Sequence, residues 1–282
     1  MALAERLRQI GEDPVAISVD ALQVYAGLET LTAAPTADSR ERLEHRLVGW
    51  LPVTETFSVG EFMPIAHAEI DAALEAGRRP IVVGGTGLYL RAALSDLELR
   101  PPPAPGVRER LEGELRARGT AALHADLAAV APEAAARVDP GDRSRVTRAL
   151  ELIESGDEPS AEPRDGRSQL WTAATRHPTL LFGLVAERNA LYAQIDQRVD
   201  GMVAAGAADE VRRAEEAGAS LTARAALGFE ELLADDVDGL KRRTRNLAKR
   251  QLTWMRKLGG LHTVDVTGRS PGEVAAELAH LL

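Results

Sequence analysis

Apolar residues along this chain form two kinds of pattern, short β-branched runs and longer helical repeats. The runs at 14–19, 80–83 and 180–185 are rich in Val, Ile and Leu. Strands that are covered on both faces of a parallel sheet have this composition, because neither face meets water. Helical repeats lie between and after these runs, so the alternation is typical of an α/β protein with a parallel sheet flanked by helices.

The pattern changes between the second and the third strand. Prolines at 101–103 and 105 break the chain, and alanine-rich helical repeats follow at 107–118, 121–130 and 132–137. A further helix at 142–156 has one basic side and one apolar side. We therefore expect residues 1–98 and 170–282 to form the α/β core and residues 99–169 to form an inserted all-helical module. The Ser-, Gly- and Pro-rich stretch at 155–168 predicts a mobile loop.

Composition narrows the class of protein. The chain has 282 residues, of which 45% are hydrophobic and 27% charged, and no apolar run is long enough to span a bilayer. Its first residues lack the apolar block of a signal peptide. The absence of cysteine excludes disulfides, thiolate metal sites and cysteine nucleophiles. We expect a cytoplasmic monomer that has no membrane partner.

The net charge of −9 disfavours a nucleic-acid partner unless the basic residues are concentrated in one place. Residues 241–257 contain eight basic side chains and no acidic one. On a helix, Leu240, Thr244, Leu247, Gln251, Trp254 and Leu258 share one stripe, and Arg245 and Lys249 lie opposite, with Arg250 in a second basic row. Such a face is either solvated or binds a polyanion. The unopposed charge favours a nucleic acid, bound through phosphate contacts.

Polar side chains follow the predicted strands where ligands bind in open parallel sheets. The strand at 80–83 runs into Gly-Gly-Thr-Gly, in which three glycines let the backbone approach a phosphate and Thr86 is the one polar side chain. Many parallel sheets end in such turns for packing alone. Asp20 ends the strand at 14–19 and could be a general base, a metal ligand or a turn residue. Gln23 adds an amide that can pair with a base edge. Arg198 borders the inward stripe of the helix predicted at 189–205, where it could extend to solvent or bind diphosphate.

Five segments resemble the tRNA dimethylallyltransferases in order and spacing, and the resemblance covers essentially the whole chain. They are residues 18–25, 84–89, 145–150, 226–232 and 249–254. The resemblance implies a P-loop-NTPase-like α/β fold with a helical insertion. It also implies transfer of a dimethylallyl group, with Mg²⁺, from dimethylallyl diphosphate to N6 of the adenosine next to the anticodon on its 3′ side.

The resemblance assigns roles residue by residue. Asp20 matches the catalytic aspartate that takes the N6 proton, Thr86 matches the threonine at the reacting diphosphate end, and Arg198 matches a diphosphate-binding arginine. Contacts with the tRNA anticodon stem-loop are implied for Asp20, Ala21, Leu22, Gln23, Thr86, Ser144, Arg145, Arg148, Arg245, Lys249 and Arg250. Ala21 and Ser144 depart from the family, which usually has serine and glutamine there.

One departure is larger. The family opens with a strand and a P-loop that binds the diphosphate, and no such motif occurs in this chain. Residues 1–7 match the helix after that loop, so we expect a start that was assigned downstream of the true one. The alternative is a catalytically impaired homologue that still binds tRNA. A second alternative is an enzyme like the adenylate isopentenyltransferases, although a free nucleotide needs neither the basic helix nor the insertion.

Overall fold

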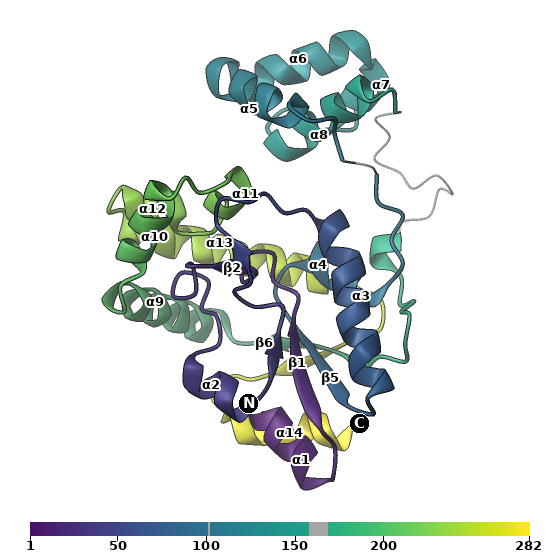
Figure 1. The fold of residues 1–282 in the computed structure, drawn as a ribbon, viewed down its shortest axis with the longest axis vertical. Helices are drawn as coiled ribbons and strands as arrows, with labels where there is room; N and C mark the ends of the chain where they lie inside the picture. Colours follow the sequence, from purple (N-terminus) through teal and green to yellow (C-terminus); the bar gives the residue numbers. More distant parts are fainter. Residues whose placement is uncertain (101, 158–168) are drawn as a thin grey trace. The chain divides into compact units, whose positions relative to one another are not determined.

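A computed structural model describes residues 1–100, 102–157 and 169–282 of the chain (Figure 1). These residues fall into two compact units. The first contains Met1–Leu97 and Leu170–Leu282, and the second contains Glu98–Gln169. Most of the loop predicted at 155–168 lies outside the described residues. No helix in the described part of the chain is both long and apolar enough to cross a membrane.

Helices and strands alternate through the first unit. Its strands are β1 (Pro14–Ser18), β2 (Tyr25–Ala26), β3 (His45–Arg46), β4 (Leu51–Pro52), β5 (Arg79–Val83), β6 (Leu181–Val185) and β7 (Leu261–Asp265). Its helices are α1 (Ala2–Gln9), α2 (Ala37–Arg42), α3 (Val59–Glu75), α4 (Gly87–Leu94), α9 (Arg188–Ala204), α10 (Ala207–Glu216), α11 (Leu221–Arg224), α12 (Phe229–Leu233), α13 (Val237–Met255) and α14 (Pro271–His280). The second unit contains α5 (Val107–Arg118), α6 (Thr120–Val130), α7 (Pro132–Ala135) and α8 (Arg143–Glu154), and the short 3₁₀ helix η1 (Gln169–Trp171) spans the boundary between the units.

Strand pairing is parallel throughout the described part of the chain. One sheet has the order β3-β1-β5, and β2-β4 and β6-β7 form two separate pairs. In the first sheet Ile17 is in register with Val82, and Ser18 with Val83. Strand β1 is buried along its whole length, as its sequence predicts. Helices α1 and α14, from the two ends of the chain, lie side by side (Figure 1).

The prediction that β5 is covered on both faces is wrong, because none of its residues is fully buried. Val83 is 54% exposed, and the edge of β5 that faces away from β1 has no strand beside it among the described residues. This edge and the corresponding part of β6 line one apolar groove of about 810 Å³, into which Leu180 and Leu184 are also exposed. Two strands with apolar sequences therefore border an open groove, and such edges favour aggregation.

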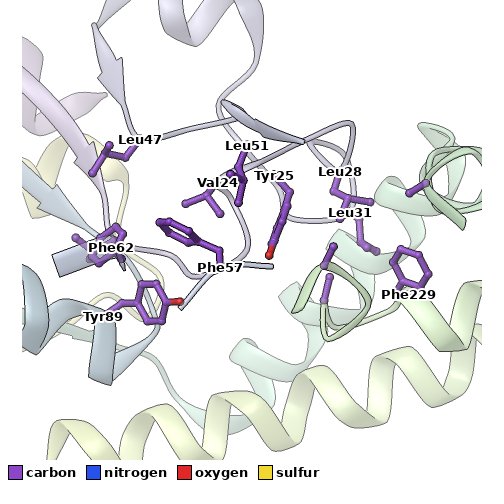
Figure 2. Packing of buried hydrophobic residues seen from close by; sticks show 14 of the residues in the cluster. Val24, Tyr25, Leu28, Leu31, Leu47, Leu51, Phe57, Phe62, Tyr89 and Phe229 are labelled. Atoms are coloured by element: carbon purple, nitrogen blue, oxygen red, sulfur yellow. The ribbon is translucent and has the colours of Figure 1, made fainter. Parts of the chain in front are cut away.

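The main core of the first unit lies beside the ends of β1 and β5. Figure 2 shows Phe57, Phe62 and Tyr89 packed next to one another, with Tyr25 and Val24 close by. The rings of Phe62 and Tyr89 have centroids 4.7 Å apart, and those of Phe57 and Phe62 meet edge to face at 6.4 Å. Because this cluster joins the start of α4 to the segment after β1, it holds two candidate site segments in place.

The second unit has its own core, built on Leu111, Leu123, Leu127 and Val146. Glu151 of α8 is buried at its edge, with a side chain that is 1% exposed. Arg108 donates to both of its oxygens at 2.7 and 2.9 Å, and Arg148 donates at 2.9 Å. Burial alone would raise the pKa of Glu151, but the hydrogen bonds from Arg108 and Arg148 hold it below its usual value.

We expect Glu151→Gln to destabilise this helical unit by about 2 kcal/mol, less than for a fully buried pair because both arginines can reach water. Since the folded-state pKa is lowered, the carboxylate stabilises the unit above the unfolded pKa of about 4.3 and stops doing so as the pH falls through the folded value. Hydrogen exchange of α5–α8 between pH 3 and pH 7 would measure both effects. Equal protection in Glu151→Gln and in the exposed control Glu133→Gln would contradict this role.

Candidate active site

Strands β1 and β5 bring Asp20 and the glycine turn to the same edge of the sheet. The Val19 amide donates to the Val83 carbonyl at 2.8 Å, so the pairing continues to the last residue of each segment. Asp20 follows immediately on one strand, and Gly84 follows on the other. The two segments that the sequence predicted as chemical are therefore neighbours in space.

The glycines in this turn are required for close packing. A Cβ on Gly84 would lie 2.7 Å from Val19 Cγ2 and 2.9 Å from the Val19 carbonyl oxygen, and a Cβ on Gly87 would overlap the indole of Trp254. Gln251 donates to the Gly85 carbonyl at 3.1 Å. The inner stripe of α13 thus covers the turn, and packing explains part of the glycine pattern.

Asp20 combines a turn role with a free oxygen. Its Oδ1 accepts a hydrogen bond from the Leu22 amide at 2.9 Å, which is the turn interpretation of this residue. No hydrogen bond to Oδ2 occurs within the described part of the chain. One oxygen thus fixes the side chain while the other can accept a proton.

Tyr89 is a neighbour that the sequence did not single out. Burial is the main cause of its raised pKa, and the charges of Tyr25, Glu61 and Asp20 add to it. The hydroxyl therefore stays protonated at neutral pH. Tyr89 is 9% exposed and belongs to the aromatic core, and the charge of Asp20 is the smallest of the causes that raise its pKa.

Gln23 is already occupied at both ends of its amide. The Ser18 hydroxyl donates to its Oε1 at 2.9 Å, and its Nε2 donates to the carbonyls of Thr32 and Ala33 at 3.2 and 3.4 Å. Pairing with a base edge would require exchange of these bonds. In this structure Gln23 ties the segment after β1 to the turn that contains Thr32 and Ala33.

Thr86 stands at the N-cap of α4, and its side chain makes no capping hydrogen bond. Within the described residues no partner for its hydroxyl is present. The side chain is half-buried at the end of β5, next to the start of an eight-residue helix. A free hydroxyl here can donate to an anion, since unpaired amides of the first helical turn point the same way.

The sequence predicted that the eight basic side chains at 241–257 have no acidic partner. For four of the eight this prediction is wrong. Lys241 pairs with Asp200 at 2.6 Å and Arg242 with Asp236 at 3.4 Å, while Arg243 pairs with Glu231 and Arg245 with Asp196. Three of these acids come from α9 and the segment around α12, which sequence spacing within one helix cannot reveal. The remaining cations, Lys249, Arg250, Arg256 and Lys257, are exposed and have no acidic partner among the residues described.

Two tryptophans extend this surface. The rings of Trp171 and Trp254 lie 4.7 Å apart, and the Lys257 ammonium lies 5.1 Å from the centre of the Trp171 ring. The predicted inward stripe of α13 contains Trp254, but nothing in the sequence pattern pointed to Trp171. Aromatic and basic side chains together suit nucleic acids, because bases stack on rings and phosphates pair with cations.

The other predicted site residues are not gathered here. Arg198 is exposed on α9, and no contact joins it to the glycine turn in the described residues. In the second unit Ser144 and Arg145 are exposed, and Arg145 lies 3.5 Å from Asp142. Arg148 is held by Glu151, so its interactions are partly structural.

No group of three or more His, Asp or Glu side chains that could bind a metal occurs among the described residues. Mg²⁺ commonly takes one or two protein oxygens and the rest from substrate phosphates and water. Asp20 and Thr86 fit that smaller donor set.

Comparison with known proteins decides the family. A model of the IPP transferase family matches residues 23–258. The tRNA dimethylallyltransferase of Rhodospirillum centenum (strain ATCC 51521 / SW) is 44% identical over 254 residues, which cover 85% of this chain and 79% of that protein. This chain belongs to the IPP transferase family. A second family member is the tRNA dimethylallyltransferase of Geobacillus kaustophilus (strain HTA426). It is 38% identical over an alignment of 294 residues, gaps included, which covers 100% of this chain and 89% of that protein.

Solved structures agree with the assignment. The crystal structure of a tRNA isopentenylpyrophosphate transferase from Bacillus halodurans matches with a TM-score of 0.68 and 32% identity, covering 99% of this chain and 88% of that one. A eukaryotic dimethylallyltransferase acting on tRNA, at 23% identity, matches with a TM-score of 0.71 and covers 99% and 73%, which shows the fold alone. The α/β fold class with parallel strands, predicted from the sequence, is confirmed, as is the family resemblance.

Proposed function

We propose that this IPP transferase moves a dimethylallyl group from dimethylallyl diphosphate to N6 of the adenosine 3′ to the anticodon of tRNA. The observation that carries the proposal is the pairing of β1 with β5, because Asp20 follows the first strand and the Thr86 turn follows the second. A carboxylate with a free oxygen and a free hydroxyl at a helix start therefore lie at the same edge of the sheet. The family's transferases act on tRNA, as the names of the relatives state.

The reaction needs these two groups on opposite sides of the allylic carbon. The N6 amine attacks that carbon, a C–N bond forms, and the C–O bond to the diphosphate breaks. Asp20 Oδ2 accepts the N6 proton, which leaves a neutral secondary amine. Thr86 donates to the oxygen that gains negative charge as the diphosphate departs. Arg198 would bind the same diphosphate after a movement of its exposed side chain.

The tRNA would meet the exposed cations of α13 and the second unit. Lys249 and Arg250 are open to phosphates, and Arg145 and Ser144 are exposed on α8. Adenine can enter the site only after leaving its stack, which costs little in an anticodon loop. Ala21, Leu22 and Gln23 follow the catalytic aspartate and would border the flipped base, with Gln23 exchanging its present bonds.

Mg²⁺, bound mainly through the diphosphate, would neutralise charge on the leaving group. Thr86, on the diphosphate side, is the residue that would offer it an oxygen. We also propose that the enzyme is a monomer and that it acts in the cytoplasm, where tRNA is processed.

We expect Thr86→Val to lower the rate of prenyl transfer by about 10²-fold, because one hydrogen bond to the developing anion is lost while the shape is kept. Steady-state kinetics with an anticodon stem-loop would measure kcat and KM separately. The matched control is Thr120→Val in the second unit, which should transfer at the normal rate. An unchanged kcat in Thr86→Val would show that the Thr86 hydroxyl does not bind the reacting end of the diphosphate.

A further inference from the structure

Helices α9 and α13 pack against each other through a ladder of charged side chains. On α9 the ladder is spaced by four residues, so that its members share one face. These members are Arg188, Tyr192, Asp196 and Asp200, and the opposing members on α13 are Lys241, Arg245 and Lys249. The contacts below show that the two helices run antiparallel.

Two rungs of the ladder are electrically balanced. Asp200 pairs with Lys241 at 2.6 Å, and Asp196 accepts from Arg245 Nε at 3.1 Å. Each cation of α13 at these rungs therefore has one carboxylate from α9. Nothing at these two positions is left for a ligand.

The last rung differs, because it contains cations and no acid. The Arg188 guanidinium lies 5.2 Å from the centre of the Tyr192 ring, and the Arg245 guanidinium lies 5.5 Å from it. Lys249 is exposed, and its ammonium donates to the neutral side-chain oxygen of Asn246 at 3.4 Å. Within the described residues, neither Arg188 nor Lys249 pairs with a carboxylate.

The Tyr192 hydroxyl is the second unusual feature of this rung. Its oxygen is buried and has no hydrogen-bond partner among the described residues. Desolvation would raise the pKa of Tyr192, but interaction with Arg188 and the charge of Lys249 lower it on balance. A buried hydroxyl without a partner costs free energy, so a site that supplies an acceptor is favoured.

We propose that Arg188, Tyr192 and Lys249 form a phosphate-binding site at the open end of the α9–α13 ladder. A phosphate oxygen accepts from the tyrosine hydroxyl, and the two cations neutralise its charge. The proposal rests on the proposed function, whose two substrates both have phosphates, the RNA backbone and the allylic diphosphate. Lys249 precedes the exposed Arg250 on the same helix, and it is two residues from Gln251, which contacts the glycine turn.

The first test is Arg188→Ala in the full chain. Binding of an anticodon stem-loop would be titrated from 50 to 300 mM KCl, and binding of inorganic pyrophosphate would be titrated in parallel. If the ligand is RNA, stem-loop affinity falls about tenfold at low salt and the slope of log K against log salt drops by about 0.7 to 0.9. If the ligand is the diphosphate, pyrophosphate affinity falls instead.

Tyr192→Phe tests the hydroxyl without changing a charge. Affinity for the same ligand should fall several-fold while the salt slope stays constant. Arg212→Ala on α10, which removes an exposed cation paired with Asp209, is the matched control and should change neither quantity. Thermal melts of all three variants separate loss of binding from loss of folding.

The outcomes distinguish this inference from the proposed function. If Arg188→Ala and Tyr192→Phe are folded and bind both ligands as tightly as the unsubstituted chain, the phosphate site is wrong, whatever the transfer assay shows. If phosphate binding depends on Arg188 but no prenyl transfer is found, the site stands and the proposed reaction fails.

Discussion

Asp20→Asn should reduce prenyl transfer by about 10³-fold, because general-base catalysis contributes 10² to 10⁴ in rate. The amide oxygen of asparagine can still accept from the Leu22 amide, so the turn after β1 is retained while the proton acceptor is lost. Single-turnover kinetics with a bound stem-loop would measure the chemical step alone. Stem-loop affinity should change little.

The control for this substitution is Asp38→Asn, which removes a carboxylate that is 79% exposed on α2. It should leave transfer at the unsubstituted rate. Transfer by Asp20→Asn within a fewfold of that control would assign the base to another group.

Gly84→Ala should lower both stability and activity. The added Cβ would meet the carbonyl and side chain of Val19, whose amide is held by a hydrogen bond to the Val83 carbonyl at 2.8 Å. Overpacking of this kind costs about 1–3 kcal/mol. Relief requires the ends of β1 and β5 to separate, and Asp20 and the Thr86 turn follow these ends. Transfer should therefore fall by more than the loss of folded protein explains. Chemical denaturation and kcat at saturating substrate would measure the two effects.

The matched substitution is Gly201→Ala in α9, where a Cβ meets nothing within 4 Å. It should stabilise the chain by about 0.5–1 kcal/mol through helix propensity and leave transfer unchanged. Equal stability and kcat in Gly84→Ala and the unsubstituted chain would show that the strand ends are not held as tightly as the geometry indicates.

Local patterns predicted much of the fold. The strands near 14–19 and 180–185, the helices of the second unit and the inward stripe of α13 follow from apolar spacing, because burial of one face sets that spacing. Buried β1 behaves as its sequence predicts. Strand β5 has the same apolar character but borders an open groove. The sequence could not predict this, because the composition of a strand does not show what lies beside it.

Long-range pairing explains what the sequence could not give. The basic residues of α13 looked unopposed because their partners, Asp196, Asp200 and Glu231, come from other elements. Gln23 looked free to read a base, yet its bonds run to carbonyls of a loop about ten residues away. The segments that contain Asp20 and Thr86 could be predicted as neighbours because the ends of parallel strands meet at one edge, a rule that needs no contact map.

The most direct measurement is the product of a reaction between dimethylallyl diphosphate and an unmodified anticodon stem-loop, analysed by mass spectrometry and nuclease mapping. It would be run with this chain and with Asp20→Asn. We predict a gain of one dimethylallyl group on the adenosine 3′ to the anticodon, lost in Asp20→Asn. No transfer by the unsubstituted chain, although the stem-loop is bound, would contradict this function.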